Sequence, residues 1–342
     1  MQIVFDDTQL GHRPSNFLVR GRLKPVPEVP ARAEILREAA ERAGHRIVKP
    51  TTDSTKLRAR IHTADYLAFL ETGWSRWQEL PDASPEMIPN VHPDRRDAPY
   101  PDAIVGQAGY HMADTAAPLA GDSWSAIRAS ADSAAHAARL VLDGAKAAYA
   151  LCRPPGHHAF ADQAGGFCYL NNSGTAAEAL REAHARVAIL DVDLHHGNGT
   201  QGIFYCRGDV LTLSIHADPA AFYPFFWGYA NERGDGEGAG FNRNFPLPLG
   251  TGDAAFLDAL DAALAVLRDY RPGALVVALG FDAHESDPFA AFKVTTRGYG
   301  EIARRIAALG MPTVLVQEGG YVSPDLGSSL VAFLAEFSTL PQ

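Results

Sequence analysis

Cysteine is scarce in this sequence of 342 residues, which contains only three. Cys152, Cys168 and Cys206 form an odd set with no C-x-x-C spacing. Such a set neither supplies a disulfide framework nor favours a zinc site built from thiolates. We therefore expect no disulfide framework, and any metal site should use other ligands.

Long apolar runs and an excess of basic charge are also missing. No stretch approaches 18 uninterrupted apolar residues, and the N-terminus lacks the basic and apolar regions of a secretory signal. The formal net charge of −10 argues against nucleic-acid binding, which draws on clustered Lys and Arg. These features predict a cytoplasmic protein with neither a membrane nor a nucleic acid as its partner.

Hydrophobic residues, by contrast, make up 46% of the chain, and short apolar runs alternate with amphipathic, Ala-rich segments. This alternation predicts βαβ units and a largely parallel sheet covered on both faces. The expected strands are Ile3–Phe5, Ala147–Leu151, Val187–Asp193, Val210–His216, Ala274–Leu279 and Thr313–Gln317. The expected helices lie near 30–43, 123–144, 172–184, 253–269, 297–309 and 325–338.

Two stretches break this pattern. Residues 78–102 contain six prolines and show neither helical nor strand periodicity, and loops of this length are usually functional or disordered. Trp74 and Trp77 come just before them, and we slightly favour an interface role over a core role for these side chains. Residues 218–244 are rich in aromatics and glycine and follow a strand, where open α/β sheets bind ligands.

Ionisable residues gather where two apolar strands end. Asp191, Asp193 and His195 would share one face if their strand stays extended, and Asp282 follows the strand at 274–279. An isolated D-x-H is most often a salt-bridged strand end. Carboxyl ends of parallel strands meet at one edge, however, and carboxylate and imidazole ligands suit zinc with one open position. The convergence therefore favours a catalytic metal site.

Two further strand ends carry polar motifs. RPPGHHA at 153–159 follows one apolar strand, and histidine is the usual proton acceptor in metal-assisted hydrolysis. EGGY at 318–321 follows another, and its glycines allow a tight turn that aims Tyr321, whose hydroxyl could donate to a developing oxyanion. Each motif is weak alone. Both are expected at the edge that holds the metal site.

These motifs together resemble a known family. RPPGHHA, GGFCYLNN, ILDVDLHHGNGT, the strand before Asp282 and EGGY occur in the order and spacing of the zinc-dependent deacetylases of the arginase–deacetylase fold. The N-terminal third, with VPARAEIL and ETGWSRW, is most similar to the bacterial acetylpolyamine amidohydrolases. The resemblance implies a single α/β domain over 1–342, with three αβα layers and a mainly parallel sheet. It also implies one zinc ion per chain, small acetylated amines as substrates, and a homodimer whose active-site entrance is shaped by residues 74–102.

The resemblance implies specific roles for site residues. The implied zinc ligands are Asp193, His195 and Asp282. The implied catalytic residues are His158 as general base and acid, Asn198 that orients it, His157 held by Asp191, and Tyr321 that polarises the amide carbonyl. The implied substrate-binding residues are Gly166, Phe167, Tyr223 and Arg32, the last in an inner acetate cavity. A site for a monovalent cation, K⁺ or Na⁺, is implied for Asp191, Asp193, His195, Ser214 and Ile215.

One departure from the resembling enzymes concerns the mouth of the substrate tunnel. Where acidic side chains would receive distal ammonium groups, this sequence carries Phe17, Val105 and Ala116. The departure favours a less cationic acylated amine, unless carboxylates such as Glu71 or Asp94 take over.

Other functions are compatible with the same motifs. The first is deacylation of acyl-lysine in proteins, and the second is a catalytically silent homologue that binds a metal or ligand. Silent relatives usually lose a metal ligand or the tyrosine, and here all of these residues are present. An arginase-like site with two manganese ions needs bridging carboxylates, which Leu194–Gly197 does not supply.

Overall fold

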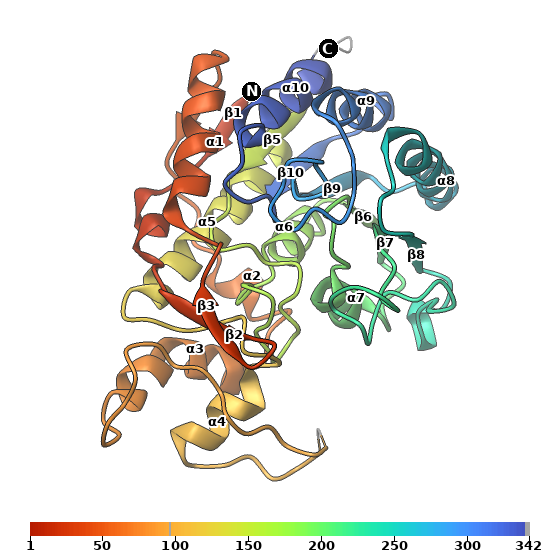
Figure 1. Ribbon diagram of the computed structural model, residues 1–342. Helices are drawn as coiled ribbons and strands as arrows, with labels where there is room; N and C mark the ends of the chain where they lie inside the picture. The colour runs from red at the N-terminus through yellow and green to blue at the C-terminus, as the bar shows by residue number, and fades with distance from the viewer. Residues whose placement is uncertain (96, 339–342) are drawn as a thin grey trace.

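The computed structural model describes residues 1–95 and 97–338, which form an eight-stranded parallel sheet between two layers of helices (Figure 1). The strand order is β4-β1-β5-β10-β9-β6-β7-β8, and every adjacent pair is parallel. The strands are β1 (Gln2–Val4), β4 (Arg46–Val48), β5 (Ala147–Ala150), β6 (Val187–Asp191), β7 (Val210–Ala217), β8 (Asn242–Leu247), β9 (Ala274–Leu279) and β10 (Thr313–Gln317).

Alternate residues of the central strands supply two separate cores. In β6, Ala188 and Leu190 join one apolar cluster and Ile189 joins the other, as the two-residue period of a strand requires. The first core is completed by α1 (Pro30–Arg42), α8 (Asp253–Tyr270), α9 (Thr296–Ala307) and α10 (Leu326–Ser338). The second is completed by α2 (Thr55–Arg58), α5 (Ser123–Leu142), α6 (Asn172–Leu180) and α7 (Asn198–Phe204). The predicted three-layer αβα architecture is confirmed.

All six predicted strands are present, but β6 ends two residues earlier than predicted. We expected β6 to continue to Asp193, whereas it ends at Asp191. The prediction that one extended strand carries Asp191, Asp193 and His195 on the same face is therefore wrong. The latter two residues lie in the loop after the strand, where the carboxylate of Asp191 accepts a hydrogen bond from the backbone N–H of Asp193 (3.1 Å).

The proline-rich segment lies between α3 (Ala64–Trp77) and α4 (Ile104–His111), in the lobe at the bottom of Figure 1. Its Met87 is fully buried and pairs with Leu119 through backbone hydrogen bonds. Both tryptophans before it are partly buried. Trp77 packs against the apolar cluster of this lobe, and the indole N–H of Trp74 donates to the carbonyl of Pro85 (3.0 Å). Arg96, within the expected 74–102 segment, lies outside the described residues.

A short antiparallel hairpin, β2 (Asn16–Val19) and β3 (Arg22–Pro25), stands apart from the main sheet (Figure 1). Both residues of its turn, Arg20 and Gly21, have positive φ, as a two-residue type I′ turn requires. Among the described helices, none is long and apolar enough to cross a membrane.

Candidate active site

The loops that follow β6 and β9 bring two carboxylates and one imidazole together. One ligand atom from each of Asp193, His195 and Asp282 lies within 4.8 Å of the others. The Nδ1 atom of His195 is 3.2 Å from Asp193 Oδ1 and 3.0 Å from Asp282 Oδ2. All three residues are buried. The sequence therefore identified a set of residues that converge in space.

This cluster favours positive charge at its centre. Burial lowers the pKa of His195, but the adjacent Asp193 and Asp282 outweigh that effect and raise it to about 9. Gly280 packs directly against the cluster, because a Cβ atom there would overlap Asp193 Oδ2. The backbone N–H of Gly319 donates to that same oxygen (2.7 Å), and the N–H of Leu194 donates to Asp282 (3.0 Å). Each carboxylate is thus held in place while its second oxygen remains directed at His195.

Two adjacent imidazoles lie beside this cluster and have different environments. His157 Nδ1 is 2.9 Å from Asp191 Oδ2, whereas His158 Nδ1 is 2.7 Å from the neutral Asn198 Oδ1. Burial opposes charge on His157, but Asp193 and Asp191 raise its pKa to about 10. Burial, followed by the charges of His157 and His195, lowers the pKa of His158 well below 6.5. One imidazole is therefore held charged and its neighbour neutral.

Tyr321 closes the cluster from the loop after β10. Its ring contacts Phe167 and Phe289 at centroid distances of 6.0 and 4.8 Å, and its backbone N–H donates to Asp287 Oδ2 (2.9 Å). Burial raises the pKa of the Tyr321 phenol well above 10, so the hydroxyl remains a hydrogen-bond donor. Burial and the nearby Asp282 raise the pKa of Asp287 to about 7.

Arg32 binds the loop after β10 that carries Tyr321. Its guanidinium donates to the carbonyls of Gly320 and Glu318 (2.6 Å to the latter), pairs with Glu28 (2.7 Å), and lies 4.8 Å from the centroid of the Tyr321 ring. The structure thus places Arg32 behind the tyrosine loop, with its donors engaged by the backbone and by a buried carboxylate.

Glu318 is a site residue that sequence reasoning missed. Its buried carboxylate accepts hydrogen bonds from the backbone N–H of Gly156 (2.6 Å), from that of His157 (3.0 Å), and from the hydroxyl of Ser173 (2.8 Å). Burial raises the pKa of Glu318 to about 7, although the nearby His157 opposes the shift. The carboxylate therefore ties the EGGY loop to the HH loop. Its position within the EGGY motif was the only signal available.

Gly166, Phe167 and Tyr223 form the walls next to the tandem histidines. Gly166 has φ +51°, and a Cβ atom there would overlap the ring of His158, so the chain needs glycine at this position. The ring of Tyr223 lies edge-on to His158 at 5.0 Å, and its hydroxyl donates to Asp114 (2.6 Å). Asp114, a second residue not predicted, also accepts from the backbone of Gly166 (3.2 Å).

Of the five residues expected to bind a monovalent cation, Asp191, Ser214 and Ile215 lie on the neighbouring strands β6 and β7, whereas Asp193 and His195 lie in the loop after β6. Asp191 and Ser214 are directly paired in the register of β6 and β7, and both line a cavity of about 10 Å³, close to the size of one water molecule. Ser214 Oγ lies 2.8 Å from His216 Nδ1. Ile215 is the next residue along β7 and is fully buried.

The three apolar residues noted at the expected tunnel mouth are not placed alike. Phe17 and Ala116 pack against the cluster of Val26, Phe167 and Tyr321, whereas Val105 is partly buried on α4 and is not a member of that cluster.

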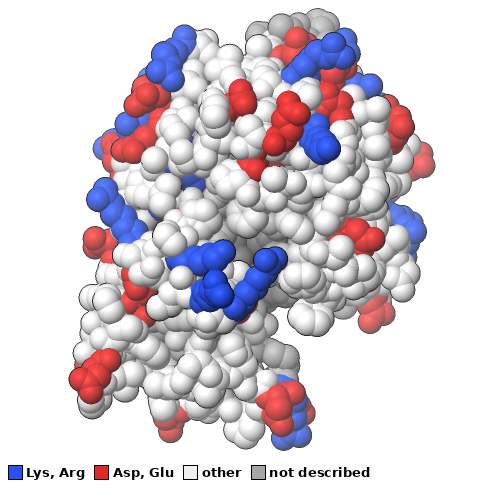
Figure 2. Space-filling model, viewed as in Figure 1, with Lys and Arg blue, Asp and Glu red and all other residues white. Residues whose placement is uncertain are grey.

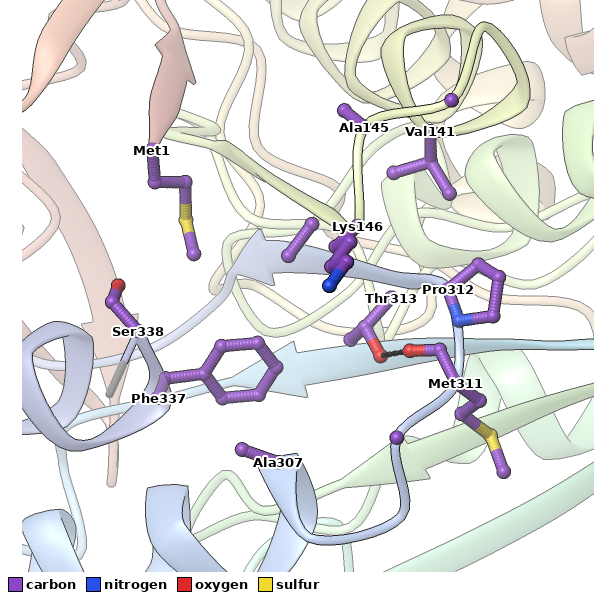
Figure 3. Close-up of a pocket in the computed structure, with 13 residues that line it drawn as sticks. Met1, Val141, Ala145, Lys146, Ala307, Met311, Pro312, Thr313, Phe337 and Ser338 are labelled. Atoms are coloured by element: carbon purple, nitrogen blue, oxygen red, sulfur yellow. Dashed lines mark hydrogen bonds between the residues drawn. The ribbon is translucent and has the colours of Figure 1, made fainter. Parts of the chain in front are cut away.

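A separate cavity of about 610 Å³ lies at the opposite edge of the sheet, where β5 and β10 begin. The side chains of Met1, Lys146 and Phe337 point toward one another across it (Figure 3). None of the site residues identified from the sequence lines it.

Comparison with known proteins gives the class of this fold and site. Residues 26–337 match the histone deacetylase domain, and the chain belongs to this family. It is 46% identical, over 99% of both chains, to an acetylpolyamine amidohydrolase of Burkholderia pseudomallei, and 43% identical over 98% of both to acetylpolyamine amidohydrolase 1 of Pseudomonas aeruginosa.

Solved structures give the same result. The crystal structure of the acetylpolyamine aminohydrolase from Burkholderia pseudomallei superposes with a TM-score of 0.97 at 46% identity, covering 99% of both chains. The HDA15 HD domain, at 27% identity, gives a TM-score of 0.81 over 99% of this chain and 91% of that one. These relatives support a deacetylase function and confirm the predicted family and fold.

Proposed function

We propose that this chain is a zinc-dependent amidohydrolase that removes acetyl groups from small acetylated amines. One observation carries the proposal: Asp193, His195 and Asp282 converge within 4.8 Å beside a tandem pair of histidines. The family and the names of the relatives support the same reaction class.

The three converging residues fit a zinc ion in donor type and number. Zinc is commonly bound by imidazole nitrogen and carboxylate oxygen, and three protein ligands leave one position open for catalysis. The raised pKa of His195 supports this assignment, because it reflects two buried carboxylates that need a positive charge between them. Zinc, when bound, supplies Lewis-acid chemistry that activates water and polarises a carbonyl group.

The remaining steps are assigned to side chains around this site. His158, held neutral and oriented by Asn198, accepts the proton of the attacking water and later donates it to the departing amine. Tyr321 keeps its proton and donates a hydrogen bond to the carbonyl oxygen as negative charge develops there. His157, kept positive by Asp193 and Asp191, stabilises the same negative charge from the neighbouring position.

The substrate and the assembly are proposed on the same basis. The carbonyl of Gly166 accepts the N–H of the substrate amide, Phe167 and Tyr223 flank the acyl-amine chain, and Arg32 borders the cavity that receives acetate. A K⁺ or Na⁺ ion is proposed for the Asp191, Asp193, His195, Ser214 and Ile215 site. We further propose that residues 74–102 help to form a homodimer and its active-site entrance, and that the protein works in the cytoplasm.

Metal analysis combined with a substrate panel tests the proposal. Purified protein should carry about one zinc ion per chain, as three protein ligands and one open position require. It should hydrolyse N-acetylputrescine faster than an acetyl-lysine peptide, and Tyr321→Phe should abolish turnover. Tyr205→Phe, a partly buried tyrosine outside the cluster, is the matched control. Full activity in metal-free protein, or in Tyr321→Phe, would contradict the mechanism.

A further inference from the structure

The β2–β3 hairpin forms one wall of the approach to Tyr321. Phe17 on β2 contacts the ring of Phe167 at 5.6 Å, and Phe167 in turn contacts Tyr321. Val26, the residue after β3, is 4% exposed and packs in the same cluster. One face of the hairpin is therefore anchored directly on the aromatic wall of the site.

Basic residues continue along this face toward solvent. In the hairpin register Phe17 is paired with Lys24, and Val19 with Arg22. Directly paired residues point to the same face of an antiparallel pair, so Lys24 and Arg22 lie on the face that Phe17 turns toward the site. Lys24 is two residues from Val26, or about 6.8 Å along a strand. The wall thus runs outward from buried Val26 to exposed Lys24 and then to Arg22.

These cations have no counter-charge in the described part of the chain. Lys24, Arg22 and the turn residue Arg20 are exposed, and none forms an ion pair with a residue in 1–95 or 97–338. Figure 2 shows Lys and Arg side chains gathered over this hairpin beside the recessed centre of that face. The chain as a whole carries a net charge of −10, so this basic group runs against the overall balance.

Two carboxylates near the hairpin are already engaged. Asp114 accepts hydrogen bonds from the Tyr223 hydroxyl (2.6 Å) and from the backbone of Ala116 (2.8 Å). Glu86 accepts one from the backbone N–H of Ser15 (2.7 Å). Burial also raises the pKa of Asp114, which weakens it as a partner for a cation. On the hairpin, Lys24 and Arg22 thus lack an ion-pair partner among the described residues, whereas Asp114 and Glu86 each already accept hydrogen bonds.

We propose that the preferred substrates carry a negatively charged group at the end distal to the acetylated nitrogen, as in N-acetylated ω-amino acids. Lys24 and Arg22 bind that group while the acetamide reaches Tyr321 along the apolar wall of Phe17 and Val26. This inference rests on the proposed deacetylase function and names its substrate class. A substrate with a distal ammonium group would instead meet like charge at the entrance.

Three acetamides of matched length test the idea on the zinc-loaded protein. They are 6-acetamidohexanoate, N-acetylcadaverine and N-hexylacetamide, which place an anion, a cation and a methyl group after five methylenes. Exposed ion pairs contribute up to about 1 kcal/mol, and both Lys24 and Arg22 act in opposite directions on the two charged substrates. We therefore expect kcat/KM for the anion to exceed that for the cation by about tenfold or more.

Charge reversal assigns the preference to the hairpin. Lys24→Glu should lower the ratio of kcat/KM for the anion to kcat/KM for the cation by about tenfold. Lys146→Glu, an equal charge change at the opposite edge of the sheet, should leave the ratio unchanged. Added salt should bring the wild-type ratio toward one, because exposed charges are screened.

The outcomes separate this inference from the proposed function. Hydrolysis of N-hexylacetamide together with a preference for N-acetylcadaverine would overturn only the anionic substrate class, as would a ratio that Lys24→Glu does not move. Hydrolysis of none of the three compounds would overturn the deacetylase assignment, and the inference with it.

Discussion

Glu318 gives the sharpest test of how the site is held together. Its carboxylate accepts two backbone N–H groups and one hydroxyl, all buried, so Glu318→Ala leaves three donors without a partner. Each buried unsatisfied donor costs about 1–3 kcal/mol, which predicts a loss of about 3 kcal/mol or more in the free energy of unfolding. That loss is a large share of the ~5–15 kcal/mol typical of a whole protein.

Glu318→Gln is the matched variant, because the amide can keep all three contacts. Its oxygen accepts the backbone N–H groups of Gly156 and His157, and its NH₂ donates to Ser173, whose hydroxyl can reverse its role. We therefore expect a loss of less than about 1.5 kcal/mol in urea-induced unfolding, half or less of that for alanine. Equal losses for Gln and Ala, or an alanine variant as stable as the wild type, would refute the reasoning.

The difference in stability between the wild type and Glu318→Gln should depend on pH. Because burial raises the pKa of Glu318 from 4.5 to about 7, the protonated acid is the form that favours the folded state. Its contribution is complete below about pH 4.5 and is lost as the pH rises through 7. Wild-type protein should therefore lose stability relative to Glu318→Gln over that interval, as measured by urea unfolding at a series of pH values.

Two further predictions concern the reacting groups. Gly166→Ala should lower kcat by at least about tenfold, because its Cβ would displace the His158 ring. Gly310→Ala is the control: this glycine shares the positive φ but has open space around it, so the change should cost only about 1 kcal/mol of stability. Equal kcat values for the two variants would contradict this reasoning. The pKa of His158, the proposed base, lies well below 6.5, so kcat/KM should stay constant as the pH falls to 6.5 and decline only at lower pH, where His158 becomes protonated. An acidic limb centred above 6.5 would contradict the assignment of His158 as the neutral base.

The parts of the fold that could be predicted are those buried on both faces. Central strands such as β9 read as continuous apolar runs because helices cover both sides of them, and all six predicted strands lie inside the sheet. The two strands of this sheet that were missed, β4 and β8, are its edges. Edge strands need not be apolar, and β8 reads NRNFPL, with a proline that is tolerated at an edge.

The residues of the candidate site also fall into those that could be predicted from the sequence and those that could not. Ligand-type residues could be found because they interrupt apolar strand ends, which is why Asp193, His195 and Asp282 were named from sequence. The residues that position them could not, because Glu318 and Asp287 act through backbone N–H groups of distant loops. Such contacts depend on the path of the chain in three dimensions and leave no periodic pattern in the sequence.

The different charge states of His157 and His158 follow from the groups that surround each ring, including the partner of its Nδ1 atom. Both are fully buried, and burial alone would make both neutral. Asp193 and Asp191 place negative charge beside His157, while Asn198 gives His158 an acceptor without charge, so positive charge accumulates on the first ring and lowers the proton affinity of the second. The motif HHGNG therefore encodes more than a pair of imidazoles. Its Asn198, together with Asp191 at the end of β6, assigns a fixed charge to one ring and leaves the other free to accept a proton.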